Sequence, residues 1–208
     1  MTTDLTLVLD LGQVVVGWDP YGALADRLTR AEWQEFSDAI DFPAINLEMD
    51  RGLTHAEAVA RVSAAHPERP GHAQILARYC ENFAASLTGP MPGTAEIIDE
   101  LAAADVRLLG LTNWSAETFR HAAPAAPAIQ LLDDVVVSGV EGYVKPDPEI
   151  FRILLDRHAL KAESTVFVDD SPANVSGASD AGLTALQFTD ARRLRADLHD
   201  LGFPIRRA

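Results

Sequence analysis

A nearly continuous apolar run at residues 5–9 ends on an aspartate, Asp10. Such a run is typical of a strand buried on both faces of a parallel sheet. A side chain at the carboxyl end of that strand lies at the crevice where open α/β sheets hold their ligands. The next segment, 11–18, is apolar, contains two glycines and is too short for a helix. We expect it to form a tight turn and a small flap over the crevice.

From residue 90 onward, predicted strands and helices alternate, which is typical of βαβ units in a parallel sheet. Asp147 and Ser171 each precede a proline, the pattern of an N-cap followed by the first helical residue, and Ser115 is a further candidate cap. The predicted strands cover 106–111, 135–137, 165–168 and 184–188, and the predicted helices cover 94–104 and 115–123 and begin at 148 and 172. The sequence therefore predicts an α/β fold with a doubly wound parallel sheet.

The region 18–86 has a helical pattern and no convincing strand. Thr29 and Thr54 are each followed three residues later by a glutamate, the spacing of a capping box. A further helix is predicted over 75–85, after a proline- and glycine-rich breaker. We therefore expect two domains: a discontinuous α/β core of residues 1–17 and 87–208 that carries the active site, and an all-helical domain of residues 18–86 inserted after the first strand.

Composition excludes several classes of function. The net charge of −14 disfavours binding to nucleic acid. No apolar run approaches the ~20 residues that span a bilayer, so we expect no membrane segment. The single cysteine, Cys80, excludes an internal disulfide and fits the reducing cytoplasm. An acidic protein must capture an anionic substrate locally, with a metal, backbone N–H groups or one well-placed cation.

Polar side chains follow four of the predicted strands, and in a parallel sheet these strand ends meet at one edge. The residues are Asp10, Thr112, Asn113, Lys145, Asp169 and Asp170. Three carboxylates brought together there would repel one another strongly unless a cation lay between them. Mg²⁺ is bound in this way by carboxylates together with substrate phosphate, and the carbonyl of Gly12 offers one more oxygen nearby. The sequence thus predicts a Mg²⁺ site at this edge.

The remaining strand-end residues form a predicted anion site. The Thr112 hydroxyl and the adjacent N–H groups, including that of Asn113, precede a predicted helix N-terminus, and Lys145 supplies a positive charge. An aspartate nucleophile beside a metal and an anion site indicates acyl-phosphate chemistry, with charge stabilisation as the main catalytic effect. Asp10 is the candidate nucleophile.

Four segments in this order resemble the ordered motifs of the haloacid dehalogenase-like (HAD) hydrolase superfamily: Asp10-Leu11-Gly12, Leu111-Thr112-Asn113, Lys145-Pro146-Asp147-Pro148 and Val168-Asp169-Asp170-Ser171. The resemblance covers essentially the whole chain, and the helical insert is similar to the cap of the C1 subclass. It implies a phosphatase-like hydrolase with a Rossmann-like core that acts on small phosphate monoesters such as sugar phosphates. The cysteine content, and not the resemblance, is the reason to expect a cytoplasmic protein.

The resemblance also implies roles for individual residues. Asp10 would attack phosphorus and form a phosphoaspartyl intermediate, while Thr112 and Lys145 stabilise the phosphoryl group. Asp170, with Asp169 and the Gly12 carbonyl, would position Mg²⁺.

One position departs from the family pattern. Many phosphatases of this superfamily have a second aspartate two residues after the nucleophile, where it acts as general acid and base, and this chain has Gly12. Loss of a general acid costs ~10²–10⁴-fold in rate. A water, Glu48 or Asp50 could replace it, although a solvated acidic turn is the better explanation of the two carboxylates.

Gly12 therefore leaves two alternatives to a phosphatase. A metal-independent 2-haloacid dehalogenase needs no acid at this position because halide leaves without a proton, but the intact pair Asp169 and Asp170 indicates a metal. A non-catalytic binding or regulatory protein is the second alternative, and retention of Asp10 and Lys145 argues against it. The substrate's identity and the choice between monomer and homodimer stay open.

Three further side chains have possible roles near the crevice. Trp18 and Trp114 flank it, where they could stack on a sugar or simply pack in the core. Asn174 follows the acidic pair by one helical turn and could orient Lys145 or a carboxylate.

Overall fold

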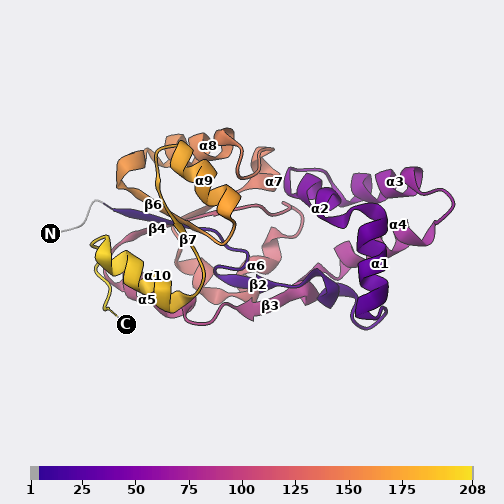
Figure 1. Cartoon of the computed structure of the whole chain (residues 1–208), viewed down its shortest axis with the longest axis horizontal. Coiled ribbons are helices and arrows are strands. Elements are labelled where there is room, and N and C mark those ends of the chain that lie inside the picture. Colours follow the sequence, from indigo (N-terminus) through magenta and orange to yellow (C-terminus); the bar gives the residue numbers. More distant parts are fainter. Residues whose placement is uncertain (1–4, 208) are drawn as a thin grey trace.

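The computed structural model describes residues 5–207 and contains a five-stranded parallel sheet in the order β5-β4-β1-β6-β7 (Figure 1). Its strands are β1 (Thr6–Leu9), β4 (Arg107–Thr112), β5 (Asp134–Val137), β6 (Thr165–Asp169) and β7 (Thr184–Gln187). Every neighbouring pair of strands is parallel. The predicted α/β fold with a parallel sheet is confirmed, and the first strand lies at its centre.

The central strand is buried on both faces, as its composition predicts. Leu7 and Leu9 belong to one hydrophobic cluster and Val8 to another, because successive side chains of a strand point to opposite faces. Leu9 lies opposite Gly110 of β4 and Val168 of β6. This register brings the residues that follow the three strands to one edge of the sheet.

Helices cover both faces of the sheet, which makes it doubly wound (Figure 1). The cluster of Leu7 and Leu9 includes side chains of α5 (Thr94–Ala103) and α10 (Ala191–Asp200). The cluster of Val8 includes side chains of α8 (Pro148–His158) and α9 (Pro172–Asp180). Asp147 and Ser171 stand at the N-cap positions of α8 and α9 as predicted, although neither side chain makes a capping hydrogen bond.

Four helices between β1 and β4 gather beyond one end of the sheet (Figure 1). They are α1 (Arg30–Ile40), α2 (Phe42–Asp50), α3 (His55–Ala65) and α4 (Gly71–Glu81), with short 3₁₀ helices at Pro20–Leu24 and Phe83–Ser86. Both predicted capping boxes are present, at Thr29 and Thr54. The rings of Trp33, Phe42 and Tyr79 pack against one another among these helices.

A two-stranded antiparallel ribbon joins the helices to the sheet. β2 (Val16–Trp18) lies within the predicted flap, and its partner β3 (Leu87–Pro90) was not predicted. Its short LTGP sequence has no apolar run that would have distinguished it from a turn. α4 also begins four residues before the predicted start at residue 75, inside the expected breaker.

The prediction of a helix over 115–123 is wrong. Turns follow β4, and the only helices before β5 are two 3₁₀ helices (Phe119–His121 and Pro127–Leu131) and the four-residue α6 (Ala122–Ala125); α7 (Ser138–Glu141) follows β5. The Trp114 ring N–H donates to the Thr118 hydroxyl, and the Ser115 hydroxyl accepts from the N–H of Glu117. These local bonds stabilise turns in place of a helix, because Ser and Thr side chains compete with the backbone for hydrogen bonds. Across residues 5–207, no helix combines the length and apolarity required to traverse a bilayer.

Candidate active site

A buried lysine stands at the centre of the strand-end cluster. The Nζ atom of Lys145 lies 2.9 Å from Oδ1 of Asp10 and 2.7 Å from Oδ2 of Asp169. It also donates a hydrogen bond of 2.8 Å to the carbonyl of Leu111 at the end of β4. Three strands, β1, β4 and β6, therefore present acceptors to one ammonium group, and the predicted convergence of strand ends is present.

Burial and the neighbouring charges shift the pKa values of Lys145 and Asp10 in opposite directions. Burial lowers the pKa of Lys145, but the carboxylates of Asp10 and Asp169 outweigh it and the net pKa is raised, so the ammonium stays charged. Burial raises the pKa of Asp10 to about 6, against the lowering effect of Lys145. Asp10 is therefore largely ionised at neutral pH, with a pKa perturbed by burial as is common at functional sites.

Asp169 has every carboxylate oxygen engaged. Oδ1 accepts from the N–H of Ser171 at 2.8 Å and from Asn174 at 3.0 Å, while Oδ2 accepts from Lys145 at 2.7 Å and Asn174 at 3.1 Å. The predicted orienting role of Asn174 matches these contacts. Asp169 is fully buried, so its geometry fits a residue that fixes Lys145.

The three carboxylates of the predicted metal site are close together. Ligand oxygens of Asp10, Asp169 and Asp170 lie within 4.8 Å of one another. Asp170 is exposed, and partial desolvation followed by the charge of Asp169 raises its pKa. Clustered carboxylate oxygens are the donors that Mg²⁺ prefers, and the residues present fit that ion. Asp10 and Asp170 are the better placed ligands, because the oxygens of Asp169 already have partners.

The predicted anion site contains an unpaired hydroxyl. Thr112 is 1% exposed, and within residues 5–207 its Oγ1 has no hydrogen-bond partner. Asn113 donates to the carbonyl of Lys145 at 3.0 Å and accepts from its N–H at 2.8 Å, so the amide side chain holds the lysine loop. The expected helix N-terminus after Thr112 is absent, since turns follow. An anion would therefore meet the Thr112 hydroxyl and loop N–H groups without a helix dipole.

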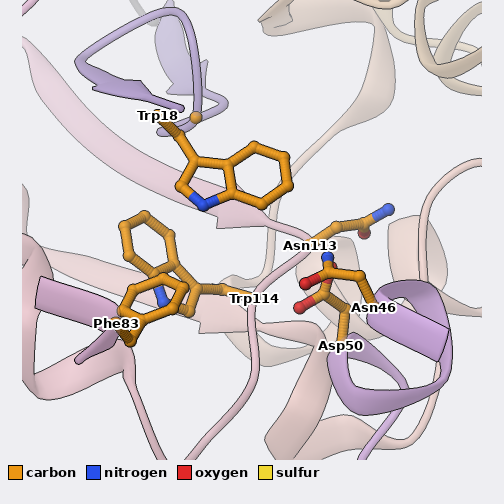
Figure 2. A pocket seen from close by; sticks show the side chains of 7 residues that line it. Trp18, Asn46, Asp50, Phe83, Asn113 and Trp114 are labelled. Atoms are coloured by element: carbon orange, nitrogen blue, oxygen red, sulfur yellow. The ribbon is translucent and has the colours of Figure 1, made fainter. Parts of the chain in front are cut away.

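A cavity of about 80 Å³ adjoins this centre, as Gly12 and Asn113 belong to its lining. Aromatic rings gather on one side and polar side chains on the other (Figure 2). The lining consists of Gly12, Trp18, Asn46, Asp50, Phe83, Asn113 and Trp114. The tryptophans expected to flank the crevice do so, and their cavity is composed of residues from both the helical region and the sheet edge.

The sequence matches the family described as haloacid dehalogenase-like hydrolase over residues 19–182. The chain belongs to this family.

The chain covers very different shares of the relatives that it matches. It is 27% identical over 203 residues to drimenol cyclase drtB of Aspergillus calidoustus, covering 97% of this chain but only 37% of that protein. It is 24% identical over 200 residues to the sesquiterpene phosphatase astK of Aspergillus oryzae, covering 96% and 97%. The HAD family enzyme BT-2542 of Bacteroides thetaiotaomicron, in complex with magnesium and inorganic phosphate, is similar with a TM-score of 0.69 at 19% identity, covering 89% of this chain and 94% of that one.

Two cavity residues of the hydrolase, Asn46 and Phe83, were not predicted. Asn46 lies on α2 four residues before Asp50, and its side chain donates to Oδ2 of Asp50 at 2.9 Å. Positions four apart share one helix face, so this pair could have been found had the limits of α2 been clear. The two acidic candidates lie on α2 and not in the expected turn: Asp50 lines the cavity, whereas Glu48 lies outside it and forms an ion pair with Arg61 at 3.8 Å.

Proposed function

We propose that this hydrolase is a Mg²⁺-dependent phosphatase that cleaves small phosphate monoesters through a phosphoaspartyl intermediate on Asp10. The observation that carries the proposal is the buried Lys145 held between Asp10 and Asp169. A paired ammonium at a strand end, beside an ionised carboxylate, is suited to neutralise the charge of a phosphoryl group as it is transferred.

Each strand-end residue then has a role. An oxygen of Asp10 attacks phosphorus in line, and the bond to the leaving oxygen breaks. Lys145 and the unpaired hydroxyl of Thr112 bind the equatorial oxygens of the phosphoryl group, together with loop N–H groups. Asp169 and Asn174 hold Lys145 in place, and Asn113 fixes the backbone of the lysine loop.

The donor set supports Mg²⁺ as the cofactor. Asp10 and Asp170 would bind it, with Asp169 beside them and the Gly12 carbonyl as the additional oxygen. When bound, Mg²⁺ supplies Lewis-acid stabilisation of the phosphoryl oxygens. The phosphatase named among the relatives and the magnesium and phosphate in the BT-2542 complex agree with this choice.

The leaving group would lie in the aromatic cavity. We take residues 18–86 as a cap domain over a core of residues 1–17 and 87–208, since the cavity is lined from both. Its volume of about 80 Å³ favours a small leaving group. A sugar phosphate suits this cavity, because the C–H face of a sugar packs on the rings of Trp18 and Trp114.

The test is phosphate release from an aryl phosphate and from a panel of sugar phosphates, by the wild type and Asp10→Asn, with Mg²⁺ and with a chelator. We expect release that requires both Mg²⁺ and Asp10. Undiminished turnover by Asp10→Asn would remove Asp10 from the nucleophile role. Chloride release from 2-chloropropionate without metal would instead indicate the haloacid dehalogenase, and failure in both assays would favour a binding protein.

A further inference from the structure

The position two residues after the nucleophile lacks a proton donor, although the fold does not demand a glycine there. Gly12 does not have a positive φ, and a Cβ built on it would meet no other heavy atom within 4 Å. A side chain could therefore be accommodated beside Asp10. The proton required by the leaving group must then come from water or from another residue that reaches the same space.

Asp50 reaches that space from the helical region. It is the last residue of α2, it is half-buried, and its side chain faces the cavity that Gly12 also lines (Figure 2). Among the seven residues lining this cavity, Asp50 alone has an ionisable side chain. Its position is therefore that of a group able to exchange protons with a ligand in the cavity.

The end of α2 is fixed to the sheet edge by direct hydrogen bonds. The hydroxyl of Ser138 on α7 donates to the carbonyl of Asp50 at 2.5 Å and accepts from the N–H of Trp114 at 2.9 Å. Arg51, the next residue, forms an ion pair of 2.6 Å with Asp147 at the start of α8. These contacts hold the Asp50 backbone against the core, which is the preorganisation that a catalytic group needs.

We infer that Asp50 is the general acid and general base of the reaction, supplied from the helical region in place of the side chain missing at Gly12. The inference deepens the proposed phosphatase function and rests on it. Glu48, two residues earlier, is excluded from the same role, because it lies outside the cavity and is paired with Arg61.

The surroundings of Asp50 suit proton transfer near neutral pH. Burial, and to a lesser extent the carboxylate of Asp10, raise its pKa to about 7, while a hydrogen bond from the backbone of Ser115 and the charge of Lys145 act in the opposite direction. The nearby phenol of Tyr79 on α4 is neutral, because burial raises its pKa well above 10. A general acid is most effective when its pKa lies near the working pH.

The two steps balance with one proton on Asp50. First, Asp10 attacks phosphorus, the bond from phosphorus to the leaving oxygen breaks, and protonated Asp50 gives its proton to that oxygen to form the alcohol. Next, the Asp50 carboxylate takes a proton from water while the water oxygen attacks phosphorus. The bond between phosphorus and Asp10 then breaks, which releases phosphate and restores both side chains.

The test compares Asp50→Asn with Glu48→Gln, a matched control that removes a carboxylate charge from the same helix outside the cavity. The substrates are an alkyl phosphate, whose leaving group needs a proton, and p-nitrophenyl phosphate, whose leaving group does not. For Asp50→Asn we expect a ~10²–10⁴-fold lower kcat on the alkyl ester. On the aryl ester we expect a burst of one nitrophenol per active site, because slow hydrolysis of the phosphoenzyme follows. Glu48→Gln should behave as the wild type.

A second variant distinguishes proton transfer from a structural effect. Gly12→Asp in the Asp50→Asn background places an acid beside Asp10, and we expect it to restore turnover of the alkyl ester. Wild-type kcat in Asp50→Asn would overturn the inference while leaving the phosphatase intact. Equal losses on both esters, no burst and no recovery in the double variant would also overturn it. If the wild type cleaves none of these esters, the phosphatase proposal itself fails. Independently, a pKa of Asp50 below 5 in a ¹³C NMR titration would overturn its role as general acid.

Discussion

Removing the unpaired hydroxyl of Thr112 should raise the stability of the protein and lower its activity, and both effects can be measured. A buried polar group without a partner costs ~1–3 kcal/mol, and Thr112 has an exposure of only 1%. Thr112→Val keeps the shape of the side chain and removes that cost. We therefore expect the ligand-free protein to gain about 1–3 kcal/mol in free energy of unfolding. In a chain of this size, Tm should rise by ~2–4 °C for each kcal/mol.

The same substitution should slow catalysis. A hydrogen bond to a charged phosphoryl oxygen contributes ~1.5–3 kcal/mol, which corresponds to a loss of about 10–150-fold in kcat. Thr94→Val is the matched control, because Thr94 on α5 is also fully buried and its hydroxyl has no hydrogen-bond partner among residues 5–207. Helix α5 contributes no residue to the site. Thr94→Val should give a similar gain in stability with unchanged kcat.

The free energy of unfolding, from urea denaturation, and kcat, from steady-state phosphate release, are measured for the wild type, Thr112→Val and Thr94→Val. A Thr112→Val protein that is less stable than the wild type would show that the hydroxyl has a partner in solution. Unchanged kcat would show that the phosphoryl group does not meet Thr112. Equal kcat losses in both variants would indicate a general effect of the substitution, and would refute the assignment of Thr112 to the anion site.

Three other measurements examine the centre. Lys145→Ala should lower kcat by at least ~10²-fold and, by leaving two buried carboxylates uncompensated, reduce stability by ~3–5 kcal/mol, as chemical denaturation would show. Asn174→Ala should lower kcat without a matching rise in KM, because it frees Asp169 without touching substrate; a change in KM alone would contradict this. Since the pKa of Asp50 is raised on folding to about 7, its contribution to stability is complete below the usual 3.8 and disappears as pH rises to about 7. Asp50→Asn should remove that part of the pH dependence in urea denaturation, and an unaltered profile would count against the raised pKa.

The sheet was predictable because its strands are short apolar runs, each ended by polar residues. A strand buried on both faces needs such a run, whatever its partners, and the order of strands and helices then determines the topology. β3 escaped prediction because its pairing depends on β2, about seventy residues earlier, and not on its own composition. The mistaken helix after Ser115 has a similar cause: its hydroxyl could have capped a helix, but local side-chain bonds stabilise turns there.

The candidate site, like the fold, could be predicted only in part from the sequence. The approach of Asp10 to Asp169 follows from parallel topology, because both stand at strand ends on one edge. Lys145 lies on the loop after β5 and is also held there by the side chain of Asn113. The unpaired state of Thr112 and the saturation of Asp169 depend on exact distances, which motif spacing does not contain. These two findings change the expected roles of the residues. Asp169 positions Lys145, and Thr112 is the hydroxyl donor available to an anion.

Asp50 shows why an acidic turn remained ambiguous in the sequence. Its neighbour Glu48 has the same chemistry and nearly the same position, and no local pattern distinguishes a cavity carboxylate from a solvated one. The distinction comes from Ser138, which lies 88 residues further along the chain and whose hydroxyl holds the carbonyl of Asp50. If the proton relay is supplied by the helical region, then losing this contact should reduce catalysis without altering the sheet. Gly12 is thus compatible with phosphatase chemistry when another helix, here α2 held by Ser138, supplies the missing carboxylate.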